Sequence, residues 1–346
     1  MSITEEQVRD ALRSVRYPGF SRDIVSFGLV KGVNIDDGEV KVQLALATND
    51  PNIPATIKSD AEKVLQALNG VRTAKVLIDI HAPPAGAGGQ VGPQRIPGIK
   101  HVIAVASGKG GVGKSTVAAN LAIAFEQTKA RVGLCDCDIY GPSISLMFGT
   151  RERPSATDEN KIIPVQQYNL KLMSMGFLLD DKSPAILRGP MVTRYTQQFL
   201  RQVDWGELDF LVLDLPPGTG DIQLTIVQTV ALAGAVVVTT PQEVALIDAR
   251  KASTMFSKVN VPVLGLVENM SYFVSPSDNK RYDIFGSGGG EREAKRLRVP
   301  LLGQIPIDIA TRESGDRGQP IVAADAQSPV AQEFIKVAAR IREKLA

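Results

Sequence analysis

The feature that most constrains the fold of this chain is the glycine-rich segment from Gly108 to Ser115. Its residues, GKGGVGKS, match the pattern G-x-x-x-x-G-K-[ST]. An apolar run, Val102–Ala106, precedes the segment, and a helical pattern, Thr116–Gln127, follows it. Such a loop binds phosphate because its glycines let backbone N–H groups turn inward and the helix N-terminus adds positive potential. The segment therefore predicts a phosphate-binding loop between a strand and a helix; the alternative is a glycine-rich turn that binds nothing.

Apolar runs continue to alternate with helical patterns after this loop. The runs are short and rich in β-branched residues, which is typical of strands buried on both faces. They are Val132–Cys135, Phe210–Leu213, Ala235–Thr239 and Val263–Val267. Helical patterns such as Val244–Lys258 separate most of them. This order predicts an α/β fold of the doubly wound P-loop NTPase kind, a mostly parallel sheet with helices on both sides.

With 346 residues, the chain is long enough for a small module in front of that domain. Residues 1–81 predict a small α+β domain. Its expected elements are a helix over Thr4–Val15 with Thr4 as N-cap, a strand over Val40–Leu46, a helix over Ile57–Leu68 and a strand over Ala74–Ile80. The stretch from Ala82 to Gly98 holds four prolines and five glycines, so we expect a linker over 82–99 and the P-loop domain over 100–346.

Composition excludes several classes of protein. The 39 basic and 37 acidic residues give a net charge of +2, so bulk charge gives no reason to expect a nucleic-acid partner. Two cysteines and two histidines exclude a disulfide framework and a conventional zinc finger. No apolar run reaches membrane-spanning length and the N-terminus is too polar for a secretory signal, so we expect a cytoplasmic protein without a membrane partner.

The glycine-rich loop predicts a nucleotide site. Lys114 is expected to reach the β- and γ-phosphates of ATP, and the Ser115 hydroxyl is expected to bind Mg²⁺. The residues expected to bind the nucleotide here are Gly108, Gly110, Gly111, Val112, Gly113, Lys114, Ser115 and Thr116.

Two further segments end in acidic residues and are candidates for the rest of this site. Asp214, at the end of one apolar run, is expected to hold the metal through a water, with the Gly218 N–H near the γ-phosphate. Asp136 and Asp138 follow another run and lie on the same side of an extended chain. Asp138 is the candidate for orienting or deprotonating the attacking water, with Asp136 nearer the metal. An ordinary strand-ending turn and an acidic loop cap are the respective alternatives.

The lysine at position 109 is not required by the general loop. Lys109 within K-G-G-V-G-K-S resembles the deviant loop of the MinD, ParA and nitrogenase-iron-protein class. The resemblance implies that Lys109 acts across a homodimer on the partner's nucleotide, as an arginine finger does. A solvated lysine is the alternative.

Several motifs narrow this resemblance to the Mrp/ApbC family of P-loop ATPases, described as iron–sulfur cluster carriers. The motifs are Asp138–Ser143 (DIYGPS), Asp214–Asp221 (DLPPGTGD), Thr240–Val244 (TPQEV), Glu268–Tyr272 (ENMSY) and Asp283–Gly286 (DIFG). The family resemblance implies apo iron–sulfur proteins or scaffold proteins as partners. It also implies that residues 1–80 are an iron–sulfur assembly domain and that Asn269 reads the adenine edge; a turn asparagine is the alternative.

One segment departs from the family pattern. Where the family usually carries C-P-x-C to bridge an iron–sulfur cluster between protomers, this chain has Ser275 and Asp278 in the cysteine positions. Hydroxyl and carboxylate groups are poor substitutes for thiolate on such a cluster. Cys135 and Cys137 are expected to be core residues. A natural cysteine-free branch, ligands from elsewhere or from a partner, and a substituted sequence all remain open.

Three functions compete on the sequence alone. The first is a slow, Mg²⁺-dependent, homodimeric ATPase in iron–sulfur cluster assembly or transfer. The second is a MinD/ParA-like positioning ATPase without a cluster, for which the C-terminal stretch Gln332–Ala346 offers an amphipathic helix; packing of that helix on the sheet is the alternative. The third, a metabolic P-loop kinase or ligase, is supported by nothing besides the loop.

Overall fold

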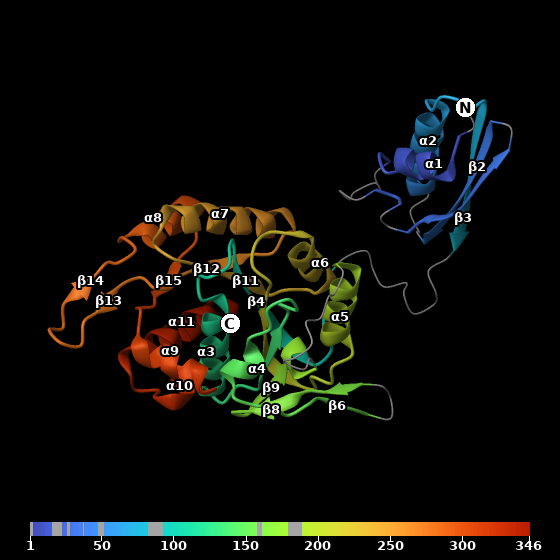
Figure 1. Cartoon of the computed structure of the whole chain (residues 1–346). Coiled ribbons are helices and arrows are strands. Elements are labelled where there is room, and N and C mark those ends of the chain that lie inside the picture. The colour runs from blue at the N-terminus through green and yellow to red at the C-terminus, as the bar shows by residue number, and fades with distance from the viewer. Residues whose placement is uncertain are drawn as a thin grey trace. The chain divides into compact units, whose positions relative to one another are not determined.

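The computed structural model describes residues 3–15, 23–25, 28–36, 38–47, 52–81, 93–157, 161–178 and 189–346. The chain divides into two compact units, Met1–Gln90 and Val91–Ala346 (Figure 1). The division falls inside the stretch for which the sequence predicts a linker, and residues 82–92 of that stretch lie outside the described residues.

The first unit is a three-stranded sheet with two helices. Its elements are α1 (Glu5–Leu12), β1 (Val30–Asp36), β2 (Glu39–Ala47), α2 (Asn52–Gln66) and β3 (Thr73–His81). Strand β2 is central; it pairs antiparallel with β1 and parallel with β3. Helix α1 begins where the sequence predicts, because Thr4 and Gln7 form a reciprocal capping box. Alternate residues of β2, from Val40 to Leu46, are buried against both helices.

Two features of this unit differ from the sequence prediction. Helix α2 begins at Asn52, five residues before the predicted start, because Pro54 fits the first turn of a helix, where its missing N–H costs nothing. Strand β1 was not predicted, since its residues show no clear alternation of apolar and polar side chains.

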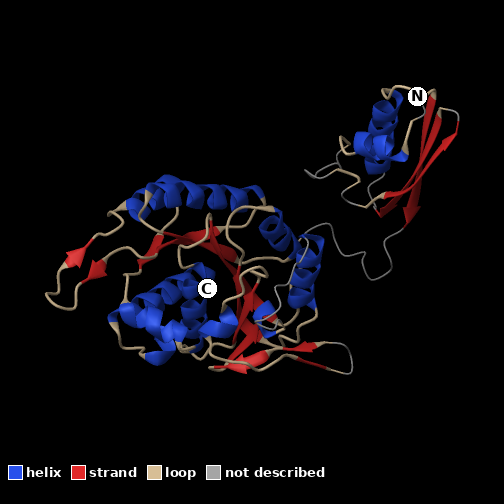
Figure 2. Cartoon of the chain, in the orientation of Figure 1, coloured by secondary structure: helices blue, strands red, loops and turns tan. Residues whose placement is uncertain are grey.

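The second unit is a large α/β domain (Figure 2). Its strands are β4 (Ile99–Ser107), β5 (Val132–Asp136), β6 (Ser155–Ala156), β7 (Ile162–Ile163), β8 (Val165–Gln167), β9 (Leu170–Met173), β10 (Leu208–Asp214), β11 (Gly234–Thr239), β12 (Val263–Glu268), β13 (Phe273–Val274), β14 (Arg281–Tyr282) and β15 (Leu301–Gln304). Its helices are α3 (Lys114–Glu126), α4 (Ile144–Met147), the 3₁₀ helix η1 (Met175–Phe177), α5 (Gly189–Arg201), α6 (Asp221–Thr229), α7 (Glu243–Lys258), α8 (Gly289–Leu297), α9 (Ile309–Asp316), α10 (Ile321–Ala324) and α11 (Pro329–Leu345).

Eight strands form one sheet in the order β15-β12-β11-β4-β10-β5-β9-β8. All neighbours are parallel except β8 and β9. The predicted doubly wound, mostly parallel P-loop fold is therefore confirmed. Because β4 lies in the middle, the glycine-rich loop that follows it stands between the carboxyl ends of β10 and β11.

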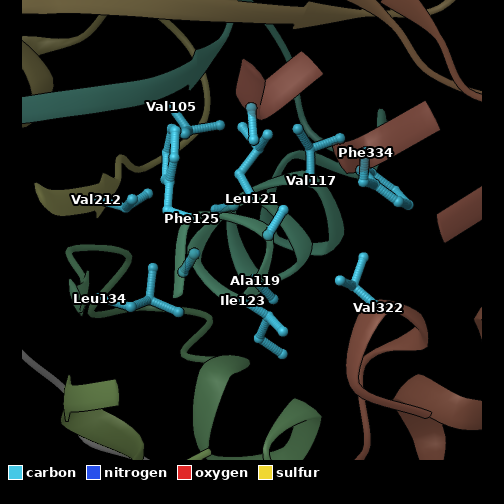
Figure 3. Packing of buried hydrophobic residues seen from close by; sticks show 14 of the residues in the cluster. Val105, Val117, Ala119, Leu121, Ile123, Phe125, Leu134, Val212, Val322 and Phe334 are labelled. Carbon is cyan, nitrogen blue, oxygen red and sulfur yellow. The ribbon is translucent and has the colours of Figure 1, made fainter. Parts of the chain in front are cut away.

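The sheet has a separate hydrophobic core on each face. Successive side chains of a strand point into one core and then into the other. Ile103 and Val105 of β4 point into a cluster with α3, α10 and α11, whereas Val102, Ala104 and Ala106 point into a cluster with α5, α6 and α7. Figure 3 shows the first cluster, in which Val117, Leu121 and Phe125 of α3 pack towards the sheet. Helix α3 is buried nearly all round, so it is held firmly behind the loop that precedes it.

The structure shows where the two ends of the second unit pack. Gln94 and Ile96, expected in the linker, belong to the second unit: Gln94 exchanges backbone hydrogen bonds with Thr229 and Ala231, and Ile96 is buried. Helix α11 buries Phe334, Val337 and Ile341 in the core, so its apolar face packs on the sheet side of the domain. No helix in the described part of the chain is long and apolar enough to cross a membrane.

Candidate nucleotide site

The glycine-rich loop joins the end of β4 to the start of α3, as predicted. Gly111 and Gly113 have φ angles of +80° and +78°, which favour glycine over any residue with a side chain. Gly108 is needed for a different reason: a Cβ there would lie 2.0 Å from the backbone oxygen of Asp248 in α7. The backbone of the loop is therefore free to curve around an anion while α7 packs closely behind it.

Lys114 and Asp214 form a buried ion pair at this loop. The Nζ atom of Lys114 donates to Oδ1 of Asp214 and lies 3.3 Å from the Ser115 hydroxyl. Their side chains are 6% and 0% exposed, so the pair is almost fully removed from water. The structure thus brings together two residues that the sequence places 100 positions apart.

The second oxygen of Asp214 has no hydrogen-bond partner, although it is buried. Burial raises the pKa of Asp214, and the charge of Lys114 opposes that rise. A buried carboxylate oxygen without a partner is costly, and it is the kind of ligand that Mg²⁺ prefers. Asp214 and the neighbouring Ser115 hydroxyl therefore fit a magnesium ion.

Asp136 lies beside Asp214, in register on the adjacent strand, but both of its oxygens are already bound by the protein. Oδ1 accepts the N–H of Asp138, and Oδ2 accepts the N–H groups of Ser143 and Ile144 and the hydroxyl of Ser174. Burial, followed by the charge of Asp214, raises the pKa of Asp136 to about 7. Asp136 therefore anchors the loop that follows β5, and its place nearer the metal stays a prediction.

Asp138 and Gly218 differ in how far their polar groups are already hydrogen-bonded. Asp138 is half-buried, and its Oδ1 accepts the N–H of Gly141. Gly218 has a φ of +95°, and its N–H donates to the Ser107 carbonyl at 2.9 Å. That N–H, expected to face the γ-phosphate, is therefore not free to bind a phosphate oxygen in this structure.

Asn269 approaches the loop from the end of β12. Its Nδ2 donates to the Val112 carbonyl at 2.8 Å and would lie 2.1 Å from a Cβ on Gly113. Asn269 therefore contacts the phosphate loop itself. It lies at the carboxyl end of β12, which is the edge of the sheet that the sequence predicts for it. Lys109 is half-buried, and its side chain has no ion pair among the described residues.

Sequence reasoning missed two serines of this site. Ser174, at the end of β9, binds Asp136 at 2.9 Å, and the buried hydroxyl of Ser143 has no partner. Ser143 closes the motif Asp138–Ser143, which could have marked it, whereas Ser174 stands in no such motif and only the fold reveals it. Thr116, by contrast, was expected here and lies in the first turn of α3, where its carbonyl accepts from Asn120.

Ser275 and Asp278 lie at the tip of the β13–β14 hairpin. Their side chains are used locally: Ser275 pairs with the Ser277 hydroxyl at 2.8 Å, and Asp278 accepts the N–H of Lys280. The expectation that the cysteines are core residues is confirmed, because Cys135 and Cys137 are buried with their sulfurs 3.9 Å apart. In the described part of the chain, no three His, Cys, Asp or Glu side chains gather in a way that could hold a metal ion.

Two family models match the chain. Residues 98–342 match the ParA model, described as NUBPL iron-transfer P-loop NTPase, and residues 5–78 match a model described as iron-sulfur cluster assembly protein. Among curated proteins, an iron-sulfur cluster carrier protein of Synechocystis sp. is 44% identical over 99% of this chain and 98% of its own length. The iron-sulfur cluster transfer protein NUBPL of Mus musculus is 47% identical over 72% of this chain and 79% of its own length.

Solved structures agree with this result. A nucleotide-binding protein of Archaeoglobus fulgidus in complex with ADP is 39% identical, with a TM-score of 0.61 over 70% of this chain and 94% of that one. The cell division ATPase MinD of Pyrococcus furiosus is 27% identical, with a TM-score of 0.55 over 71% of this chain and 99% of that one. The resemblance found in the sequence motifs is thereby confirmed. The chain belongs to the ParA/NUBPL family of iron-transfer P-loop NTPases and carries an iron–sulfur cluster assembly domain in front of the NTPase domain.

Proposed function

We propose that this protein binds and hydrolyses Mg²⁺-ATP and that it uses this cycle in the assembly of iron–sulfur clusters or their transfer to apo-proteins. The observation that supports it most is the buried pair of Lys114 and Asp214 beside Ser115, with one Asp214 oxygen left without a partner. A lysine and a metal ligand in these positions match the needs of a β,γ-phosphate with its magnesium ion. The names of the relatives supply the second half of the proposal.

The roles of the other residues follow from their places around the loop. Backbone N–H groups of the loop and the N-terminus of α3 hold the phosphates, and Lys114 exchanges part of its contact with Asp214 for the γ-phosphate. Asp138 is half-buried, has spare acceptor capacity and is close enough to Asp214 for its charge to raise the pKa of that residue, so it orients the attacking water. Asn269, already at the loop, is placed to read the base.

The working form is a homodimer in this proposal, joined across the nucleotide edge. Large apolar side chains are exposed there: Tyr140 (58%) follows Asp138 by two residues, and Val244 (64%) lies on the first turn of α7, whose Asp248 touches Gly108. Exposed apolar groups at an active-site rim favour a covering partner. Lys109, half-buried and without an ion pair among the described residues, is then the group that reaches the partner's nucleotide.

The iron–sulfur cluster is cargo in this scheme, and the hairpin tip does not fit it. Ser275 and Asp278 offer hard oxygen donors that are engaged in the turn, and the two thiols of the chain are buried elsewhere. We therefore propose that the protein assists cluster assembly without binding the cluster through this hairpin. Ligands from a partner would hold it instead.

Two measurements test the proposal. Steady-state phosphate release with Mg²⁺-ATP should be slow but measurable, and it should disappear when Mg²⁺ is chelated. A strain lacking the protein should show reduced activity of an iron–sulfur enzyme, restored by the parent sequence and not by a Lys114→Ala variant. Undetectable ATP binding would overturn the enzymatic half; unchanged iron–sulfur enzyme activity would overturn the cellular half.

A further inference from the structure

A polar pocket of about 490 Å³ lies outside the nucleotide site, between α4, η1 and the end of α9. Helices α4 and α9 contact each other there, although they are far apart in the sequence (Figure 1). The charged groups that line this pocket are Arg151, Glu152, Arg153, Asp316 and Arg317. We call it the arginine pocket. None of these residues has a part in the proposed nucleotide chemistry.

Two glycines fix the shape of the pocket. Gly149 ends α4 and Gly318 follows α9, with φ angles of +63° and +77°. Their backbones touch so closely that a Cβ on Gly318 would lie 2.2 Å from the Cα of Gly149. The Tyr168 hydroxyl donates to the Gly318 carbonyl at 3.2 Å and holds this contact from a third segment. The pocket is therefore a consequence of the fixed packing of α4 against α9.

The free charge in the pocket is positive. Asp316 is already paired with Arg312, 2.8 Å away, which leaves Glu152 as the acidic group of the lining that has no ion pair among the described residues. Arg151 and Arg317 are exposed and make no ion pair among the described residues. Guanidinium groups present paired N–H donors that match a carboxylate. Leu146, 64% exposed, adds an apolar surface to the same lining.

Both walls of the pocket are tied to one carboxylate of the nucleotide site. Oδ2 of Asp136 accepts the N–H of Ile144 at the start of α4, and α4 continues to Leu146 in the pocket wall. The same oxygen accepts the Ser174 hydroxyl, which in turn accepts the N–H of Gly176 in the opposite wall. A displacement of either wall therefore reaches Asp136 through one or two hydrogen bonds.

We propose that the arginine pocket binds an acidic peptide segment of a partner protein and that this binding is coupled to the nucleotide site through Asp136. The arginines select carboxylates, and Leu146 favours a peptide with an apolar side chain beside them over a bare inorganic anion. If the peptide binds one arrangement of α4 and η1 more tightly than another, a nucleotide that changes this arrangement must also change the affinity of the pocket for the peptide.

Fluorescence anisotropy with a labelled peptide of the repeat Glu-Leu-Glu tests the binding on the full chain, first without nucleotide. The parent should bind it, and added salt should weaken binding because the contact is ionic. Arg151→Glu and Arg317→Glu should each weaken binding about tenfold or more. Arg296→Glu, at an exposed position of α8 outside the pocket lining, is the matched control and should bind like the parent. Circular dichroism confirms that each variant is folded.

Three outcomes would overturn the binding proposal: no binding by the parent, equal loss in Arg296→Glu, or inorganic phosphate binding as tightly as the peptide. The coupling rests on the proposed nucleotide site, so it is measured second, with Mg²⁺ and a non-hydrolysable ATP analogue. The peptide affinity should change severalfold with the analogue in the parent. An unchanged affinity, in a sample whose analogue binding is shown by calorimetry, would overturn the coupling; absent analogue binding would instead count against the proposed function.

Discussion

The side-chain amide of Asn269 donates a hydrogen bond to the backbone carbonyl of Val112, 2.8 Å away, across 157 positions of sequence. This contact joins the end of β12 to the turn that is expected to hold the phosphates. It also explains why position 113 is glycine, since a Cβ there would overlap Asn269. The residue expected to read the base is therefore part of the same rigid unit as the phosphate loop.

Changing Asn269→Ala should lower the preference for ATP over GTP, because the side-chain amide that we propose reads the base is lost. Loss of the bond to Val112 should also lower stability by about 1 kcal/mol. Nucleotide titrations by calorimetry measure the preference, and thermal unfolding measures the stability. If the ratio of the two affinities stays that of the parent, Asn269 does not read the base.

Changing Lys114→Ala should abolish measurable ATP binding, because the phosphates lose their principal cation. It should also leave the buried Asp214 without a countercharge, which typically costs about 3–5 kcal/mol. The double variant Lys114→Ala/Asp214→Asn is the control, because it removes both charges: its unfolding temperature should recover while binding stays lost. Normal ATP affinity in the single variant would refute the site.

Changing Lys109→Ala should leave ATP binding nearly intact, since this side chain has no partner in the described parts of its own protomer's loop. Turnover should fall, and ATP-dependent dimerisation should weaken, because the cross-dimer charge on the partner's γ-phosphate is missing. Sedimentation velocity with and without Mg²⁺-ATP checks the dimer. Equal turnover and equal dimerisation in parent and variant would remove the cross-dimer role.

The pH dependence of the protein's stability should reveal the titration of Asp136. Burial raises its folded-state pKa to about 7, above the ordinary 3.8, so between these values the folded chain binds more protons than the unfolded chain. Stability of the nucleotide- and Mg²⁺-free protein should therefore fall as pH rises from about 4 to about 7. In Asp136→Asn, which keeps one acceptor for the loop, thermal unfolding should depend less on pH. A slope as steep as the parent's would contradict the raised pKa.

Changing Ser275→Cys together with Asp278→Cys should give the hairpin the thiolates that it lacks. After anaerobic reconstitution with iron and sulfide, the double variant should gain iron and visible absorbance, whereas the parent should hold little of either. Ser277→Cys, also on the exposed tip, is the matched control because a single thiol cannot hold the cluster. If the double variant gains no more iron than the parent, thiolates at these two positions do not bind a cluster.

Several elements of this structure follow from sequence patterns that span only a few residues. The glycine-rich loop, the apolar runs from β4 to β12 and the capping box at Thr4 each depend on residues close in sequence, so their structures were predictable. The loop also implied Lys114, Ser115 and Asp214 as a set, because a strand–loop–helix unit brings the ends of parallel strands to one edge.

What the sequence alone determined is the fold class, the phosphate loop and the absence of cysteines from the hairpin. Only the tertiary structure decided that the oxygens of Asp136 are taken by Ser174 and by the start of α4, that the Gly218 N–H is used by Ser107, and that Gly149 and Gly318 shape an arginine pocket. The physical reason is the same in each case. Each contact joins segments from different parts of the chain. Tertiary packing decides which groups meet, and such long-range contacts produce no periodicity or fixed spacing in the sequence.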